Sequence, residues 1–166
     1  SMVTNEKLRF DISHAEPIPN KTLINIENLV NQIILDNSEV KETIMNIEDA
    51  KSMNAMALFG EKYEENVRVI EMGFDNEFTE KKPYSVELCG GSHVKSTGDI
   101  GVFKILSESG LAAGIRRIEA VAGFEAIKLF QKKEDDINKI SLLMKTNSDL
   151  LVSKIQKLIN DKKGLE

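Results

Sequence analysis

Hydrophobic residues recur at every second position in most of six short stretches of this chain. In residues 7–13, for example, Leu8, Phe10 and Ile12 fall on one face and polar residues fall on the other. Successive side chains of an extended backbone point to opposite faces, so this period predicts half-buried strands. The six predicted strands are residues 7–13, 40–44, 67–72, 84–88, 102–107 and 115–121.

A second pattern, with hydrophobic residues three and four positions apart, predicts an amphipathic helix from Asn20 to about Asn37. Asn20 is the expected N-terminal cap, because its side-chain oxygen can accept a hydrogen bond from the first turn. The polar side of this helix carries Glu27, Asn28 and Asn31.

Three further helices are predicted. A short one covers residues 47–53 with Asn46 as its cap, and two longer ones cover residues 124–144 and 151–159. Polar residues 146–148 separate these two longer helices and can cap the N-terminus of the second one. The hydrophobic repeats are too few to predict a coiled coil.

Strands separated by helices and by hairpin-like connections indicate the α+β class, with a mixed, largely antiparallel sheet, packed helices, and further helices at the C-terminal end. Residues 73–83 are the predicted surface connection, and residues 109–114 the predicted hairpin loop. After Gly123 charged residues alternate with a helical hydrophobic stripe. We therefore expect a domain over residues 3–123 and a helical linker over residues 124–166.

Composition narrows the functional classes. A chain of 166 residues with 41% hydrophobic content can bury one core. The net charge of -5 argues against a dedicated nucleic-acid binder, so any RNA contact has to use a local basic patch. A single cysteine excludes an internal disulfide and fits a reducing cytoplasm. No apolar run predicts a membrane span or a secretory signal, and Ser1-Met2 suggests a cloning remnant at the start of an excised fragment.

The candidate chemistry lies in the segment Cys-Gly-Gly-Ser-His, residues 89–93, which follows the predicted strand 84–88. A thiolate and a neutral imidazole are ligands that zinc selects, and the two glycines free the backbone to turn both side chains toward one point. The alternative is that Cys89 is a small buried hydrophobe and His93 an ordinary loop histidine. His14 is a possible third ligand, although a strand-end histidine satisfied by polar neighbours is the favoured interpretation.

Several linked blocks of sequence resemble the editing domain of bacterial alanyl-tRNA synthetase. They cover most of residues 7–125 and occur in the same order as in that family. The blocks are residues 8–14, 55–63, 87–94, 97–105, 107–110 and 114–120.

This resemblance implies a hydrolase that removes serine or glycine wrongly esterified to tRNA(Ala), a correction needed because small side chains differ too little for one pocket to reject them. It implies Cys89 and His93 as zinc ligands, with Ser92 beside them where the family usually has threonine. The family's other two zinc ligands come from an upstream His-x-x-x-His motif, so we expect this chain alone to bind zinc weakly and to hydrolyse little. The parent enzyme is a cytoplasmic ligase that charges tRNA(Ala) with alanine, using ATP and Mg²⁺ elsewhere.

The expected RNA contacts are Arg116 and Arg117. They fall on opposite strand faces, so one could meet a phosphate while the other forms an internal ion pair. Scattered Lys62, Lys95 and Lys104 are weaker candidates. Residues 54–60 are either a tight packing turn or a wall near the reactive site.

Two other functional readings stay open at this point. The chain could be a non-catalytic tRNA-binding module whose C-terminal helices pack back on the domain or form a homodimer. It could also be a free-standing editing protein or the similar editing domain of threonyl-tRNA synthetase, although the helical tail and the residue 89–93 context favour the alanyl type.

Overall fold

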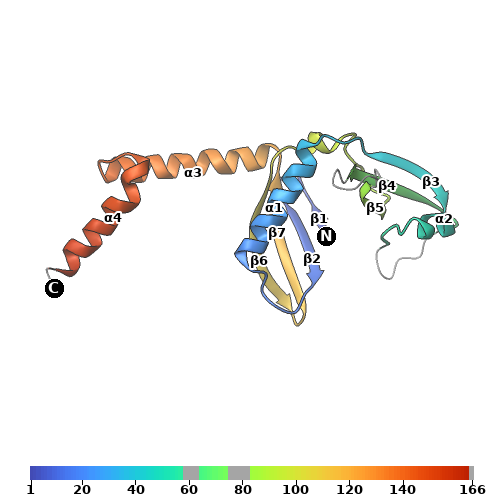
Figure 1. Ribbon diagram of the computed structural model, residues 1–166, viewed down its shortest axis with the longest axis horizontal. Helices are drawn as coiled ribbons and strands as arrows, with labels where there is room; N and C mark the ends of the chain where they lie inside the picture. The colour runs from blue at the N-terminus through green and yellow to red at the C-terminus, as the bar shows by residue number, and fades with distance from the viewer. Residues whose placement is uncertain (58–63, 75–82, 165–166) are drawn as a thin grey trace. The chain divides into compact units, whose positions relative to one another are not determined.

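The computed structural model describes residues 1–57, 64–74 and 83–164 (Figure 1). It divides the chain into two compact units, Ser1–Gly123 and Phe124–Glu166. The first unit contains two antiparallel sheets with helices, and the second contains two helices. The predicted α+β class is therefore confirmed. Within the described ranges, no helix combines the length and the apolar character that crossing a membrane requires.

The larger sheet has four strands in the order β1-β2-β7-β6, all antiparallel to their neighbours. Its strands are β1 (Met2–Val3), β2 (Leu8–Ser13), β6 (Phe103–Ala112) and β7 (Ile115–Ala122).

The predicted hairpin loop at residues 109–114 is wrong in extent, because β6 continues to Ala112. Ser109 pairs with Arg117, and Gly110 pairs with Arg116. The turn needs only the next two residues, and Gly114 takes a positive φ of 71° that favours glycine. Small residues therefore suggested a loop where cross-strand pairing holds an extended backbone.

Helix α1 (Asn20–Leu35) confirms the predicted amphipathic helix, but its cap differs from the prediction. Pro19 occupies the N-cap position and makes no side-chain cap hydrogen bond, so Asn20 is the first helical residue. The fixed φ of proline suits the residue that leads into a helix. Ile34 is the buried residue of this helix.

The polar side of α1 contacts the edge of the four-stranded sheet, and Figure 1 shows the helix beside β6. The Asn31 amide donates to the Phe103 carbonyl at 2.8 Å, and the Phe103 amide donates back to Asn31 Oδ1 at 2.9 Å. Glu27 accepts from Lys104 Nζ at 2.7 Å and from the Ile105 amide at 2.8 Å. These side chains satisfy backbone groups on an edge strand, which otherwise tend to pair with another chain.

The smaller sheet has three antiparallel strands in the order β3-β4-β5. They are β3 (Lys41–Asn46), β4 (Asn66–Phe74) and β5 (Pro83–Leu88), and helix α2 (Ile47–Ser52) contacts β3 and β4. The predicted cap of α2 is confirmed, because Asn46 Oδ1 accepts from the Glu48 amide at 2.9 Å. The buried core here consists of Ala50, Val67, Val69 and Leu88.

Two antiparallel sheets thus replace the single mixed sheet that the pattern predicted. In the described part of the chain, the parallel contact is an isolated bridge between Met56 and Glu87. There the Met56 amide donates to the Val86 carbonyl at 2.8 Å, and the Leu88 amide donates to the Met56 carbonyl at 2.9 Å. The segment around Met56 therefore supports the outer edge of β5, while residues 58–60 of the predicted wall lie outside the described residues.

A short 3-10 helix, η1 (Thr97–Ile100), links β5 to β6 and was not predicted. The fully buried Thr97 hydroxyl donates to the Ile33 carbonyl at 2.8 Å and accepts from the Ser38 amide at 2.9 Å. The Val40 amide also donates to the Lys95 carbonyl at 2.9 Å. These bonds tie the end of α1 to the segment that follows β5.

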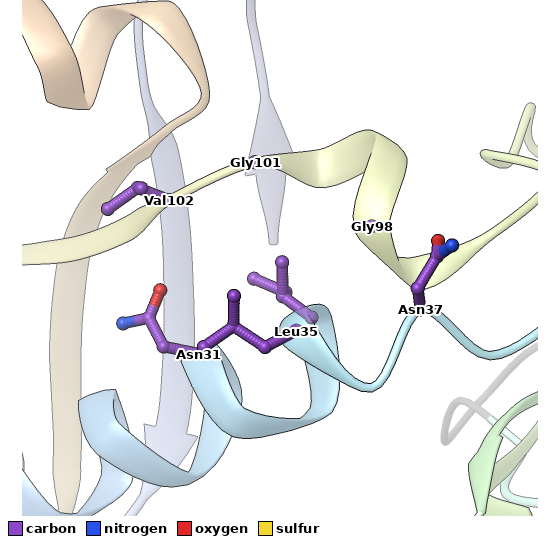
Figure 2. Close-up of a pocket in the computed structure, with 7 residues that line it drawn as sticks. Asn31, Leu35, Asn37, Gly98, Gly101 and Val102 are labelled. Atoms are coloured by element: carbon purple, nitrogen blue, oxygen red, sulfur yellow. The ribbon is translucent and has the colours of Figure 1, made fainter.

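A largely apolar cavity of about 490 Å³ lies beside this link (Figure 2). Figure 2 shows Asn37 next to Gly98, where α1 has ended and η1 begins. A Cβ atom on Gly98 would overlap Asn37 Oδ1, so a larger residue there would force the Asn37 side chain to move. The cavity is lined by Asn31, Ile34, Leu35, Asn37, Gly98, Gly101 and Val102.

The second unit consists of α3 (Phe124–Leu143) and α4 (Ser148–Lys163), as the helical stripe predicted. Asn147 caps α4 by accepting from the Leu150 amide at 3.0 Å. Leu143 and Val152 are 84% and 78% exposed, so these helices present apolar side chains to solvent.

Replacing Thr97 by valine keeps the shape of the side chain but removes the hydroxyl between Ile33 and Ser38. We expect Thr97→Val to lower the free energy of unfolding by about 2 kcal/mol, because buried backbone groups lose their partner. Urea denaturation measures this change. The control Thr43→Val, at an exposed strand position, should stay within about 0.5 kcal/mol of the parent. Equal stability of the two variants would contradict the role given to the Thr97 hydroxyl.

Candidate metal centre and flanking arginines

Cys89 lies immediately after β5, at the position that the predicted strand indicated. The last residue of β5, Leu88, pairs with Val69 on β4. The Cys89 amide then donates to the Arg68 carbonyl at 3.2 Å, which extends the contact between the two strands by one residue. The thiol is free and half-buried. A rigid strand end thus fixes the backbone of the candidate ligand while the adjoining loop begins there.

His93 is half-buried, and its Nδ1 atom is buried without a hydrogen-bond partner in the described structure. A buried polar atom without a partner costs about 1–3 kcal/mol, so a native structure usually supplies one. A metal ion is one group that can satisfy an imidazole nitrogen. Ser92, between this histidine and the glycines, is exposed.

The two glycines of the loop have a smaller role than the sequence suggested. Neither Gly90 nor Gly91 has the positive φ that L side chains rarely adopt. A Cβ atom on Gly90 would meet no atom within 4 Å, and one on Gly91 would lie 3.7 Å from Cys89 Sγ, an ordinary contact. The loop conformation therefore has to be held by contacts rather than by glycine freedom.

Arg68 makes those contacts and was not identified from the sequence. Its Nη1 atom donates to the Cys89 carbonyl at 3.3 Å and to the Gly91 carbonyl. Its Nη2 atom donates to the Glu42 carboxylate, and this bond holds the pKa of Glu42 below its usual value. The charge of His93 lowers the Glu42 pKa further, so His93 also lies within electrostatic range of the pair.

The sequence contained one weak signal for Arg68. Val67 and Val69 alternate around it and belong to the buried core, so Arg68 has to point to the other face of β4. No spacing or motif links it to a loop 21 residues later. A single long-range contact of this kind leaves no periodic trace in a sequence.

The two candidate ligands fit zinc in type but do not complete a site. Cys89 offers a thiol, and His93 offers an imidazole nitrogen that lacks a partner. Within residues 1–57, 64–74 and 83–164, no three His, Cys, Asp or Glu side chains gather into a group that could hold a metal. The option of His14 as third ligand is therefore wrong. His14 lies after β2, where its amide donates to the Gly114 carbonyl at 2.9 Å.

Both candidate RNA-binding arginines are engaged in ion pairs. Arg117 donates to Asp11 through Nε at 2.6 Å and through Nη2 at 2.8 Å. Arg116 contacts Glu108 through Nε and, at 2.9 Å, through Nη2. The sequence suggested an internal pair for one of them, and the structure has it for both. Contact with RNA stays a prediction. It requires a phosphate to displace the carboxylate from the guanidinium, or to bind the same guanidinium beside it.

Of the three lysines suggested as weaker RNA contacts, the structure describes two. Lys104 is paired with Glu27 across the α1–β6 contact. Lys95 is exposed, and Lys62 lies outside the described residues.

Part of the chain is similar in sequence to a known domain family. Residues 67–119 match the family model of the threonyl and alanyl tRNA synthetase second additional domain. The matched range contains Arg68, the loop from Cys89 to His93, and both arginines of β7. This part of the chain is therefore similar to a domain found in aminoacyl-tRNA synthetases.

The whole chain is also similar to a segment of alanine-tRNA ligases. It is 47% identical to that enzyme from Ruthia magnifica subsp. Calyptogena magnifica, 51% to that from Rickettsia bellii and 49% to that from Rickettsia felis, over all 166 residues. The chain spans 18% of the length of each relative. The resemblance found in the sequence is thus confirmed, because the whole chain is similar to a segment of alanine-tRNA ligases.

The Asp11–Arg117 pair predicts a pH dependence of stability. The hydrogen bonds from Arg117 hold the pKa of Asp11 below its usual value. A carboxylate with a lowered pKa stabilises the fold above its unfolded pKa, and this contribution is lost as pH falls through the folded value. We expect Asp11→Asn to be less stable than the parent at pH 7. The difference should shrink as pH falls below about 4.

Urea unfolding at pH 7, 5 and 3, followed by circular dichroism, checks this prediction. Glu16→Gln removes one negative charge from an exposed loop position and serves as the control. A difference between Asp11→Asn and the parent that stays constant from pH 7 to pH 3 would show that the ion pair does not contribute.

Proposed function

We propose that this chain is part of the editing region of an alanyl-tRNA synthetase, which hydrolyses Ser-tRNA(Ala) and Gly-tRNA(Ala). The observation that carries the proposal is the buried His93 nitrogen without a partner, four residues after the only thiol of the chain. The match of the surrounding residues 67–119 to a synthetase domain shared by threonyl and alanyl enzymes supports it.

In the proposed site, Cys89 and His93 hold a zinc ion. Zinc supplies a Lewis acid that polarises an ester or orients a water molecule. The end of β5 fixes the backbone of Cys89, and the unpartnered His93 nitrogen is available to a metal ion. The exposed Ser92 hydroxyl is proposed to hydrogen-bond the substrate or the attacking water. Ser92 retains the hydroxyl of the threonine usual in the family and lacks its methyl group.

The remaining zinc ligands are proposed to come from the His-x-x-x-His motif that the resemblance implies. A structural or catalytic zinc site needs at least three protein ligands, and this chain contributes two. The chain by itself should therefore bind zinc weakly and hydrolyse mischarged tRNA poorly. Charging of tRNA(Ala) with alanine, which uses ATP and Mg²⁺, is proposed for other parts of the longer enzyme.

The proposed partner is tRNA(Ala), bound in the cytoplasm. A net charge of -5 gives little long-range attraction to RNA, so the contact depends on local groups. Arg116 and Arg117 are the proposed local groups. Each already forms a bidentate fork with a carboxylate, the geometry that also suits a phosphate.

A second candidate function is a non-catalytic tRNA-binding or dimerisation module. The exposed apolar residues Leu142, Leu143 and Val152 on the terminal helices favour this candidate. An editing domain of the threonyl type is less favoured, because the 47–51% identities over the full chain are to alanine-tRNA ligases.

The test compares this chain with a longer protein that includes the proposed upstream histidines. We expect the longer protein to hold zinc and to deacylate Ser-tRNA(Ala), and the present chain to do neither at a comparable level. Cys89→Ala in the longer protein should abolish zinc binding and slow deacylation more than about 100-fold, since even changes around a metal's ligands cost 10–100-fold. Ser153→Ala, at an exposed position on α4, is the control.

Metal content and single-turnover deacylation are the two measurements. If the longer protein binds tRNA(Ala) but holds no zinc and hydrolyses nothing, the binding-module function replaces the editing function. If Cys89→Ala leaves zinc and activity intact, the metal site lies elsewhere.

A further inference from the structure

Arg68 lies on the central strand of the three-stranded sheet, next to the candidate loop. On β3 the residue opposite it is Ile44, and Glu42 lies two positions away on the same face. Diagonal neighbours on one face of an antiparallel pair are within reach of long side chains. The Arg68–Glu42 ion pair uses this diagonal, and it places the guanidinium between β3 and the loop that follows β5.

The guanidinium holds two carbonyls of that loop at once. The Cys89 and Gly91 carbonyls flank Gly90, and both accept from Arg68 Nη1. Residues 89–95 lie outside any helix or strand, so their backbone lacks the regular bonds of a ladder. A charged donor between two carbonyls defines the direction of both peptide groups, and hydrogen bonds to charged groups are worth more than neutral ones.

The far end of the loop is held by the residue that precedes β3. The Val40 amide, just before β3, donates to the Lys95 carbonyl at 2.9 Å. Glu42 reaches the near end of the loop through Arg68. Val40 thus binds one end of the segment that carries Cys89 and His93 directly, and Glu42 contacts the other end through Arg68.

We propose that Arg68 is a positioning residue, which fixes the loop backbone so that the Cys89 thiol and the His93 imidazole face one ligand. The identity of that ligand as zinc rests on the proposed function, whereas the positioning itself rests on the contacts of Arg68. The Arg68 side chain is 25% exposed and the Glu42 side chain is 51% exposed. Solvent therefore weakens the attraction between their charges, and the main effect of the pair is to fix the direction of the guanidinium.

Lysine cannot replace arginine in this role, although it preserves the charge. Its ammonium group is a point charge, whereas the planar guanidinium presents a rigid set of donors to the two carbonyls and the carboxylate together. Arg68→Lys therefore separates geometry from charge. Arg117→Lys is the matched control, because Arg117 forms a similar arginine-carboxylate pair on the other sheet.

The experiment measures ¹⁵N relaxation of the 166-residue chain. In the parent we expect order parameters near 0.85 for the Gly90 and Gly91 amides, as in a rigid backbone. In Arg68→Lys they should fall below about 0.6, while the amide of Val69 on β4 stays rigid. Arg117→Lys should leave the loop values unchanged. Glu42→Gln is a second variant that loosens Arg68 without removing it, and it should lower the same two values by a smaller amount.

Zinc affinity of the longer protein separates this inference from the proposed function. We expect Arg68→Lys to raise the zinc dissociation constant about tenfold, as for other groups that orient metal ligands. If the loop stays rigid in both Arg68→Lys and Glu42→Gln, or if zinc affinity is unchanged in Arg68→Lys, the positioning role is overturned. If the loop loosens but the parent longer protein holds no zinc, the editing function fails while the hold of Arg68 on the loop stands.

Discussion

The loop from Cys89 to Lys95 is held at both ends by hydrogen bonds, and the arrangement of the candidate site depends on this hold. At its start, β4 fixes Cys89 through a backbone bond and through the Arg68 side chain. At its end, Lys95 is bound to Val40, and the buried Thr97 hydroxyl joins the last turn of α1. The loop can therefore lack regular structure and still present its side chains in one arrangement, which a binding site requires.

Charges in this unit serve mainly to join its elements. Arginines pair with carboxylates between β2 and β7, between β6 and β7, and between β3 and β4, and a lysine joins α1 to β6. Partly exposed pairs contribute little energy each, but bidentate pairs define which strands lie side by side. The consequence for RNA recognition is direct. A phosphate that binds Arg116 or Arg117 has to compete with the carboxylate that already pairs with that arginine.

The sequence predicted most elements because their signals are local. Alternation identified the strands, and Asn46 and Asn147 capped their helices as expected. It also placed Cys89 at a strand end. The prediction fails where residues distant in sequence determine the conformation, because pairing with β7 holds residues 109–112 extended in β6 instead of in the expected loop. Arg68 and Thr97, which hold the candidate site, act through hydrogen bonds across 21 and 64 positions, and no short pattern reports them.

The proposed editing centre requires Cys89 and His93 to bind one zinc ion. The most direct measurement is zinc X-ray absorption spectroscopy on the longer protein, because it reports which atoms touch the metal. We expect one sulfur ligand at about 2.3 Å together with nitrogen ligands at about 2.0–2.1 Å, and loss of the sulfur signal in Cys89→Ser. A zinc bound only by nitrogen and oxygen, or a sulfur signal that persists in Cys89→Ser, would contradict this proposal.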